Sequence, residues 1–332
     1  MEKNCWSNKR VLVTGAGGFI GSHLVEQLVI RGAHVRAFVR YNSRGDPGLL
    51  RMVSPQVRSQ IEILSGDIRD AGAVRQAVDG CAYVYHLAAL ISIPYSYLHP
   101  IEVADTNFTG TLNVLMASRE ARVERVVHTS TSEVYGTAQY IPIDESHPLQ
   151  GQSPYSASKI GADKLAESFY SAYGLPVVTI RPFNTYGPRQ SARAVIPTII
   201  TQALASQTIC LGNLETTRDF TYVDDTVNGF LRGVEADDVE GKTFNLGTGE
   251  EIQIGQLARL IIDKVGNPVE IEIDEQRLRP RDSEVFRLHS DNRSARDHLG
   301  WAPQYCLDQG LDRTIAWISE HLGLFRVGSY QF

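Results

Sequence analysis

The sequence predicts an α/β fold in which a doubly wound parallel sheet is joined to a smaller, discontinuous C-terminal domain. Three observations support this prediction. In the first half of the chain, short runs rich in β-branched residues alternate with amphipathic stretches of helical length. A glycine-rich turn directly follows the first of these runs. After Arg181 the regular alternation ends, which indicates that a second structural unit begins there.

The strands of the sheet are predicted from the β-branched runs, at residues 10–14, 34–39, 61–64, 83–87, 125–129 and 177–181. The stretches between them contain the predicted helices, at about residues 19–31, 71–78, 100–119 and 154–173. This alternation is typical of a parallel sheet that is covered by helices on both faces.

The second unit starts in residues 182–193, where prolines, Gly187 and arginines predict a long functional loop. Two later segments, 219–232 and 242–246, are candidates to return to the sheet. We therefore assign residues 1–181, with a return near 213–249, to the first domain. Residues 182–212 and 250–332 are assigned to the second domain.

Composition narrows the classes of function. Of the 332 residues, 42% are hydrophobic and 21% charged, a globular balance that argues against disorder. The net charge is −6, and the sequence has no basic stripe of the kind that binds nucleic acid. We therefore expect a small-molecule partner. Four cysteines without a CxxC pair support neither a disulfide framework nor a zinc site, and we expect no metal. The first apolar segment is interrupted at Gly15, unlike a secretory signal or membrane span, which favours a cytoplasmic protein.

Three glycines, Gly15, Gly18 and Gly21, lie between the first predicted strand and the first predicted helix. Glycine permits positive φ at a turn, lets the backbone approach a pyrophosphate, and lets helix and strand pack closely. The triplet alone also fits an ordinary glycine-rich turn. Its position between strand and helix favours a dinucleotide site in the first domain.

The end of the second strand predicts which dinucleotide is bound. NAD sites place a carboxylate there for the ribose hydroxyl, whereas this chain has Arg40 and no acidic residue before Asp46. A guanidinium suits a 2′-phosphate, so NADP is favoured and NAD is possible. The alternative is that Arg40 is solvated and neutral groups hold the adenosine. Asp67, after the third strand, is a candidate for the adenine edge or a plain turn aspartate.

Tyr155 and Lys159 stand four residues apart after Pro154, so both side chains emerge from one face of the helix predicted at 154–173. A phenol is a poor base at neutral pH, but a nearby ammonium and the positive nicotinamide ring would favour phenolate. Tyr155 could then remove a hydroxyl proton as hydride leaves the same carbon. The same spacing also occurs in ordinary packing with a surface lysine. The glycine triplet upstream favours catalysis.

Thr131, Ser132 and Glu133 directly follow the strand predicted at 125–129, at the sheet edge where open parallel sheets bind ligands. Thr131 can hydrogen-bond a sugar hydroxyl, and Glu133 can exchange a proton. Local capping of a turn is the alternative for Thr131 and Ser132. An unpaired buried carboxylate is costly, which favours a functional role for Glu133.

These residues resemble the extended short-chain dehydrogenase/reductase family that acts on nucleotide sugars, over essentially the whole chain. The resemblance implies a Rossmann-type fold, and a homodimer through the helices near 100–119 and 154–173. It also implies that Phe19, Ile20 and Ile68 contact the cofactor. The motifs that carry it are Gly15-x-x-Gly18-x-x-Gly21, Asp67, Leu87-Ala88-Ala89, Tyr155-x-x-x-Lys159 and Arg181-Pro-Phe-Asn184-x-Tyr-Gly187.

Within that family, residues 131–140 and 154–163 are most similar to sugar-nucleotide 4,6-dehydratases, in particular the legionaminic-acid-pathway type, which acts on a nucleotide-activated N-acetylglucosamine. The resemblance implies that Tyr155, activated by Lys159, takes the 4-hydroxyl proton as hydride leaves C4. Glu133 then removes the C5 proton, water leaves C6, and hydride returns to C6. Ser132 stands where dTDP-glucose dehydratases have aspartate, so the group that protonates the 6-hydroxyl is not identified.

The resemblance also implies the substrate contacts. Asn184, Arg189, Arg218 and Arg279 match positions that contact the diphosphate, and the strip from Val195 to Leu211 resembles the nucleobase pocket. UDP-glucuronate decarboxylases and 4-epimerases are the enzyme alternatives. A dinucleotide-sensing binding protein is the non-enzyme alternative. The nucleobase, the 2-substituent of the sugar and the configuration at C5 stay open.

Overall fold

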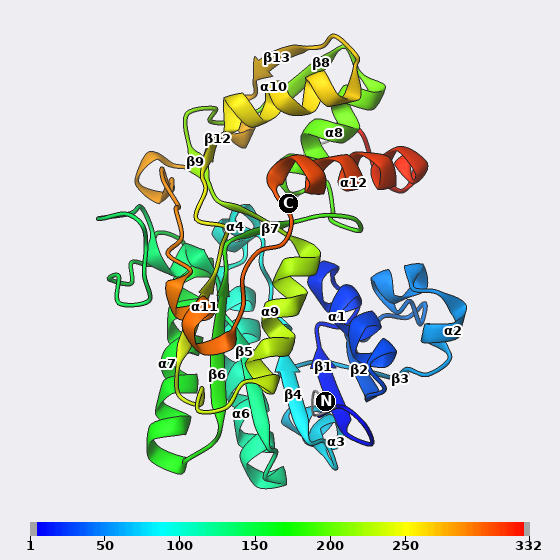
Figure 1. The fold of residues 1–332 in the computed structure, drawn as a ribbon, viewed down its shortest axis with the longest axis vertical. Helices are drawn as coiled ribbons and strands as arrows, with labels where there is room; N and C mark the ends of the chain where they lie inside the picture. Colours follow the sequence, from blue (N-terminus) through cyan, green and yellow to red (C-terminus); the bar gives the residue numbers. More distant parts are fainter. Residues whose placement is uncertain (1–4, 329–332) are drawn as a thin grey trace.

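The computed structural model describes residues 5–328, and its centre is a parallel sheet with strand order β11-β6-β5-β4-β1-β2-β3 (Figure 1). All six strands that the sequence predicted are present, with ends shifted by at most two residues. The α/β, doubly wound fold class is therefore confirmed. The strands are β1 (Arg10–Thr14), β2 (His34–Arg40), β3 (Glu62–Gly66), β4 (Tyr83–His86), β5 (Arg125–Thr129), β6 (Val177–Pro182) and β11 (Thr243–Leu246).

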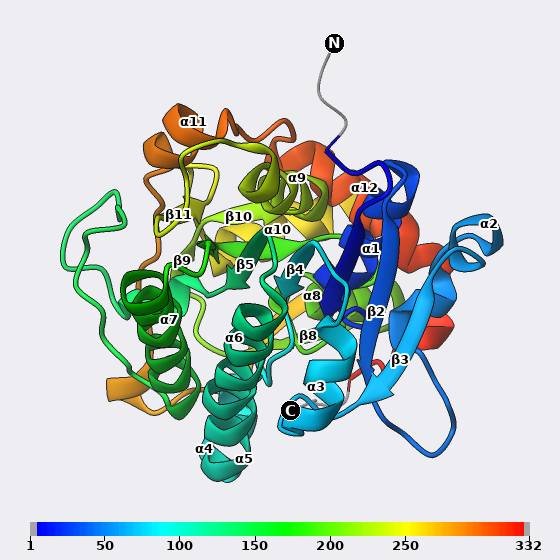
Figure 2. The ribbon, with the colours of Figure 1, turned by 90° about the horizontal axis from the view of Figure 1, so that it is seen from below.

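Apart from the edge strand β3, the strands bury residues on both faces of the sheet, because successive side chains point to opposite sides. On β1, Val11 and Val13 belong to the core formed with α1 (Phe19–Ile30) and α9 (Val223–Glu235). Leu12 belongs to the core formed with α3 (Ala71–Val78), α6 (Gly110–Ala121) and α7 (Pro154–Tyr173). Figure 2 shows these helical layers on either side of the sheet. Burial on both faces explains why the strands read as continuous apolar runs.

The helix predicted at 100–119 is divided in the structure. It consists of α5 (Pro100–Ala104), one wide π-helical turn (Asp105–Thr109), and then α6. The wide turn contains the buried Asn107, whose Oδ1 accepts the N–H of Leu90 at 2.8 Å and whose Nδ2 donates to the Ser158 hydroxyl at 2.9 Å. Asn107 thereby joins the loop after β4 to α7. A uniform helical pattern does not reveal such a turn, which is frequent at functional sites.

Only one of the two segments expected to return to the sheet does so: residues 242–246 contain β11, beside β6. Residues 219–232 were a wrong prediction for the sheet. They contain β10 (Phe220–Tyr222), which pairs with β7 (Asn184–Tyr186) in a separate small sheet, and most of α9. The apolar residues of α9 recur at helical spacing and cover the sheet from one side.

Beyond the carboxyl ends of the strands lies a second layer, at the top of Figure 1. Its members are α8 (Val195–Ala205), β8 (Thr208–Leu211), α10 (Ile254–Val265), β13 (Glu270–Ile273) and α12 (Leu307–Glu320). Helix α8 packs against α10 and α12, and β8 pairs with β13 in parallel. Helix α11 (Arg293–Leu299) instead packs on α9 and β11. The division into two domains stays a prediction, and its residues 1–4 and 329–332 lie outside the described part of the chain.

The remaining elements are short and connect the layers. They are α2 (Pro55–Arg58), α4 (Ile93–Leu98), β9 (Thr217–Arg218), β12 (Ile252–Gln253) and the 3-10 turns Gly48–Met52, Ser132–Tyr135, Glu275–Arg277, Arg281–Ser283 and Leu322–Leu324. Within residues 5–328, every helix is too short or too polar to cross a membrane.

Candidate active site

A cavity of about 1330 Å³ is lined both by the carboxyl ends of the sheet strands and by residues of the second layer. It collects site residues that the sequence predicted from distant segments. Lys159 is not on its wall but is buried one turn further along α7 than Tyr155. The predicted residues that line the cavity are Gly15, Gly18, Phe19, Ile20, Gly21, Arg40, Asp67, Ile68, Leu87, Ala88, Ala89, Thr131, Ser132, Glu133, Tyr155, Asn184, Arg189, Val195, Leu211, Arg218 and Arg279.

The glycine turn after β1 has the geometry of an anion site. Gly15 adopts a φ of +68°, and a Cβ there would lie 2.8 Å from the backbone nitrogen of Ala88. A Cβ at Gly21 would lie 2.3 Å from the carbonyl oxygen of Gly15. Gly18 is the N-cap of α1, and within residues 5–328 no side chain caps this helix end. Its first N–H groups are therefore available to an anion, which fits the pyrophosphate of a dinucleotide.

At the end of β2, basic groups line the cavity. Arg40 is 67% exposed and lies 3.3 Å from Glu102 in a surface ion pair. Arg44 and Arg51 line the same end of the cavity. Asp67, expected at the adenine edge, accepts two bonds from the Arg69 guanidinium, at 2.9 and 2.6 Å. The hydrogen bonds from Arg69 lower the pKa of Asp67 to about 2, so its carboxylate stays ionised but engaged.

Helix α7 holds Tyr155 in its first turn. Ser153 is the N-cap: its hydroxyl accepts the N–H of Ser156, and the Ser156 hydroxyl accepts the N–H of Ser153, which forms a capping box. Pro154 is the first residue of the helix. Burial raises the pKa of Tyr155 well above 10, opposed by a hydrogen bond with Thr131 and reinforced by the charge of Glu133. The expectation that the neighbouring ammonium favours phenolate is not met by these residues alone. A positive charge on a bound nicotinamide is the remaining source of that effect.

Lys159 lies one turn after Tyr155 on α7, and a backbone carbonyl group holds its ammonium. Its Nζ donates to the carbonyl oxygen of Thr129, at the end of β5, at 2.6 Å. Burial lowers the pKa of Lys159 from 10.5 to about 8, opposed by the charge of Asp163. The ammonium therefore sits close to its ionisation point near neutral pH.

Asp163 is a supporting residue that the sequence reasoning missed. It is fully buried and accepts hydrogen bonds from His128 at 3.1 Å, Ser130 at 2.8 Å and Arg181 at 2.9 Å. Burial alone would raise its pKa, but the hydrogen bond from His128 and the charge of Arg181 lower the pKa to about 2. The signal was available, because Asp163 stands four residues after Lys159 on the same helix face.

The residues after β5 form a short 3-10 turn, Ser132–Tyr135, with Thr131 as its N-cap. The hydroxyl of Thr131 accepts the N–H of Glu133 at 3.2 Å, so Thr131 caps this turn, as one of the two alternatives expected. Thr131 also forms a hydrogen bond with Tyr155. Ser132 is buried. The Glu133 side chain is 14% exposed and lines the cavity, which places a carboxylate in the same space as Tyr155.

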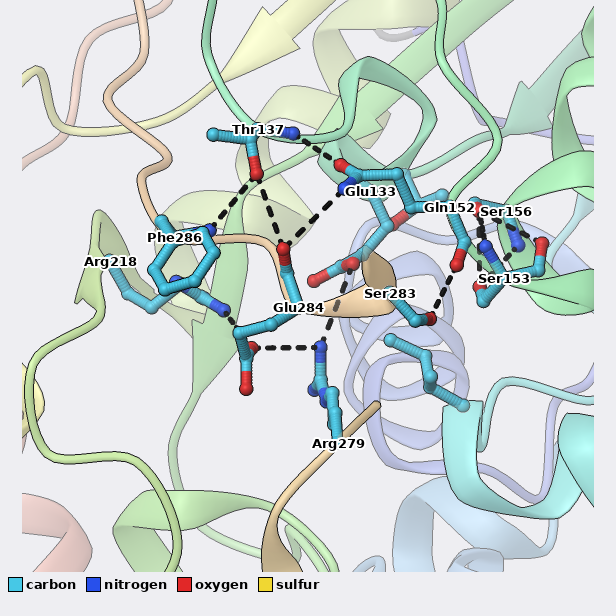
Figure 3. A network of polar contacts seen from close by, with 12 residues as sticks. Glu133, Thr137, Gln152, Ser153, Ser156, Arg218, Arg279, Ser283, Glu284 and Phe286 are labelled. Carbon is cyan, nitrogen blue, oxygen red and sulfur yellow. Dashed lines mark hydrogen bonds and ion pairs between the residues drawn. The ribbon is translucent and has the colours of Figure 1, made fainter. Parts of the chain in front are cut away.

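The arginines expected at the diphosphate have different surroundings. Arg189 lines the cavity, but its guanidinium donates to Glu26 of α1 at 2.6 Å. Arg218 and Arg279 both lie near Glu284, with nitrogen–oxygen distances of 3.6 and 3.8 Å (Figure 3). Asn184 begins β7, and Val195 and Leu211 form part of the wall supplied by α8 and β8.

Glu284 is a further carboxylate on the cavity wall, and the sequence reasoning missed it. It follows the 3-10 turn Arg281–Ser283 on an irregular segment, with no motif around it. Figure 3 shows that Arg279 lies between Glu284 and Glu133. No periodicity or spacing predicts this contact, because it joins parts of the chain about 150 residues apart.

Known proteins match the chain over nearly its full length. A family model described as "GDP-mannose 4,6 dehydratase" matches residues 12–314. The chain is 36% identical to a UDP-glucose 4-epimerase of Mycolicibacterium smegmatis, with 92% of this chain and 97% of that protein covered. It is 34% identical to a dTDP-glucose 4,6-dehydratase of Streptomyces griseus, with 94% of each covered. The structure of dTDP-glucose 4,6-dehydratase from Streptomyces venezuelae, solved with NAD bound, matches with a TM-score of 0.85 and 32% identity, covering 96% of this chain and 99% of that one.

Proposed function

We propose that this chain is a 4,6-dehydratase of a nucleotide-activated hexose. The premise is that the chain belongs to the GDP-mannose 4,6-dehydratase family of extended short-chain dehydrogenases/reductases. The family includes relatives named for epimerisation as well as dehydration, so membership alone supports only the shared oxidation at C4. The observation that carries the finer proposal is the carboxylate of Glu133. It lines the same cavity as Tyr155 and is close enough to perturb its titration. Oxidation at C4 needs no such second base, whereas elimination across C5 and C6 does.

The glycine turn and the open N-terminus of α1 fit the pyrophosphate of a nicotinamide dinucleotide, in agreement with the NAD in the Streptomyces venezuelae structure. When bound, that cofactor accepts hydride from C4 and returns it to C6. We assign NADP as the preferred form, because Arg40, Arg44 and Arg51 line the end of the cavity next to β2.

The residues of the chain supply the proton transfers. Tyr155 removes the 4-hydroxyl proton, and the positive charge of a bound nicotinamide ring would favour its ionised form. The resulting 4-ketone acidifies the C5 proton, which Glu133 removes before water leaves from C6. Glu133 returns a proton to C5 at the end. The proton that Tyr155 took from the 4-hydroxyl balances the hydroxide that leaves C6, so the net change is the loss of one water.

The substrate is assigned by its diphosphate and its sugar. Arg218 and Arg279 supply guanidinium groups inside the cavity, and Asn184 supplies an amide. The wall from Val195 to Leu211 is the proposed nucleobase pocket. From the family resemblance, a nucleoside-diphosphate N-acetylglucosamine is the first substrate to test.

Liquid chromatography, which separates epimers of equal mass, followed by mass spectrometry of the products tests the proposal and its alternatives together. The protein is incubated with NADP or NAD and, separately, with UDP-N-acetylglucosamine, GDP-mannose, dTDP-glucose and UDP-glucuronate. We expect one of the first three to lose water. Loss of carbon dioxide from UDP-glucuronate would identify a decarboxylase, and isomerisation at constant mass a 4-epimerase. No change in any of them would favour a binding protein.

A further inference from the structure

Four charged side chains meet at one side of the cavity: Glu133, Arg218, Arg279 and Glu284 (Figure 3). Nη1 of Arg279 lies 4.0 Å from Oε2 of Glu133 and 3.8 Å from Oε1 of Glu284. Nη2 of Arg218 lies 3.6 Å from the same Glu284 oxygen. Two guanidinium groups therefore balance two carboxylates, and Arg279 is shared between them.

Arg279 is held loosely by both carboxylates. At 4.0 and 3.8 Å, both separations are too long for a hydrogen bond, whose N···O distance is most often about 2.9–3.0 Å. Its Nη1 atom is shielded from solvent, yet among residues 5–328 it has no hydrogen-bond acceptor. A buried N–H donor without an acceptor is costly, so a phosphate oxygen entering the cavity offers it a better partner.

Glu284 is fixed relative to Glu133 by the backbone around it. The carbonyl oxygen of Glu284 accepts from the Thr137 hydroxyl at 3.3 Å and from the Gln152 amide at 3.5 Å. The Ser283 hydroxyl donates to the carbonyl oxygen of Gln152. Figure 3 shows these bonds joining the Glu284 segment to Thr137, which follows the turn Ser132–Tyr135, and to Gln152, which precedes α7. The backbone of the Glu284 segment is thus anchored, and Arg279 lies between its carboxylate and that of Glu133.

We propose that Arg279, shared between Glu133 and Glu284 in the free protein, couples binding of the substrate's diphosphate to the basicity of Glu133. The idea rests on the proposed function, in which Arg218 and Arg279 bind that diphosphate. A diphosphate brings two negative charges and takes over the N–H groups of Arg279. Glu133 then loses the positive charge beside it and becomes a stronger base only when substrate is bound. Arg279, Arg218 and the phenol of Tyr155 face Glu133, and Glu284 shares Arg279 with it.

Proton uptake on binding measures this coupling directly, since a carboxylate that loses a positive neighbour binds protons more readily. The parent protein is the Tyr155→Phe variant loaded with NADP, which is expected to bind without turnover. It is titrated calorimetrically with UDP-N-acetylglucosamine, GDP-mannose and dTDP-glucose at about pH 5, near the ordinary range of carboxyl groups. Buffers of different ionisation enthalpy give the number of protons taken up.

We expect uptake on the order of a few tenths of a proton in the parent. At saturating ligand, adding Glu133→Gln or Arg279→Gln to the parent should at least halve the number of protons taken up. Adding Arg279→Lys should leave that number nearly unchanged. Glu251→Gln is the matched control, because Glu251 pairs with Arg287 and does not line the cavity. Thermal melting confirms that each variant is folded.

The coupling is wrong if the parent takes up no protons, or if the uptake is the same with Glu133→Gln or Arg279→Gln as without it. An equal loss with Glu251→Gln also overturns it. The proposed function fails separately. If the wild type epimerises its sugar while the parent still shows the expected proton uptake, the coupling stands and the proposed dehydration is wrong. Failure of all three sugar nucleotides to bind overturns both.

Discussion

At the scale of single residues, the surroundings of Tyr155, the proposed base, do not favour its ionised form. Burial and the charge of Glu133 raise the pKa of Tyr155, and only the hydrogen bond with Thr131 opposes them. The buried Lys159 reaches the carbonyl oxygen of Thr129 instead of the phenol. Tyr155 therefore depends on a positive charge that arrives with the cofactor, which keeps it protonated until the site is loaded.

Replacing Tyr155 by Phe tests whether the phenol starts the reaction. The ring still fills its buried position, so Tyr155→Phe should fold and bind sugar nucleotide. Without the hydroxyl, C4 oxidation should fall by roughly 10²–10⁴-fold, the usual effect of removing a positioned base. Single-turnover absorbance of reduced nicotinamide gives the rate. A variant that oxidises C4 at nearly the wild-type rate would place the base elsewhere.

Arg40 determines the predicted choice of cofactor. Its ion pair with Glu102 is exposed, and such pairs contribute little, so Arg40 is free to turn to a 2′-phosphate. We expect NADP to bind better than NAD by about 1–3 kcal/mol, and Arg40→Ala to narrow that gap. Titration of cofactor-stripped protein with both dinucleotides measures it. Arg75→Ala, whose guanidinium pairs with Glu120 outside the cavity, is the control. Equal or tighter binding of NAD by the wild type would contradict the assignment.

The residues foreseen from the sequence are those that belong to local patterns. Gly15, Tyr155 and Glu133 each stand at a fixed offset from the end of a strand or the start of a helix, so the fold delivers them to one cavity. Glu284 and the engagement of Arg189 by Glu26 depend on contacts between remote segments. Those contacts are determined by tertiary packing, which spacing in one sequence does not encode.

At the scale of elements, α7 carries the proposed catalytic residues Tyr155 and Lys159 and the supporting Asp163 on one face. Tyr155, Lys159 and Asp163 follow each other at intervals of four, and Asn107 holds the helix through Ser158. The limits of this helix were predictable, because Pro154 and the capping serine mark its start and Gly174 its end. The π turn that delivers Asn107 was not predictable, since it preserves the apolar spacing of an ordinary helix.

The buried Lys159 makes stability depend on pH. Its pKa is about 8 in the folded chain and 10.5 when exposed, so between these values the unfolded chain binds more protons. Folding is therefore favoured as pH rises through this window. Relative to Lys159→Met, the unfolding free energy of the wild type should rise by roughly 2 kcal/mol between about pH 7.5 and 10. Urea denaturation at both values measures the change.

Lys164 on the same helix provides the matched control. Its side chain is 61% exposed, so Lys164→Met should show no comparable pH dependence relative to the wild type. If the difference in unfolding free energy between the wild type and Lys159→Met stays constant from neutral to alkaline pH, the burial-driven lowering of the Lys159 pKa is contradicted.

At the scale of the whole molecule, the parallel sheet was predictable from the alternation of strands and helices, and the glycine turn indicates the edge at which the site forms. The second layer was predicted only as a region where this alternation stops. Its short strands pair across long stretches of sequence, as β8 does with β13, so local pattern contains little information about it.

The predicted homodimer is supported by exposed apolar side chains on the helices near 100–119 and 154–173. Ile101 is 79% and Leu98 60% exposed, and Phe108, Met116, Tyr170 and Tyr173 are also exposed. Ile101→Lys should raise the dimer dissociation constant by roughly 10- to 100-fold, because it buries an unpaired charge. Ile30→Lys, at another exposed site, on α1, is the control, since Ile30 is 63% exposed. A monomeric wild type in sedimentation, or no effect of Ile101→Lys on the dimer, would contradict the prediction.

The central claim is that Glu133 turns the C4 oxidation shared by the family into dehydration. Reaction in deuterated water tests it most directly, by comparing the wild type with Glu133→Gln, which retains size and most hydrogen bonding but lacks a basic oxygen. The wild type should place solvent deuterium at C5 of a 4-keto-6-deoxy product. Glu133→Gln should still oxidise C4, while elimination falls by roughly 10²–10⁴-fold. A variant that forms this product at the wild-type rate, or a wild type that releases carbon dioxide or only inverts C4, would contradict the account.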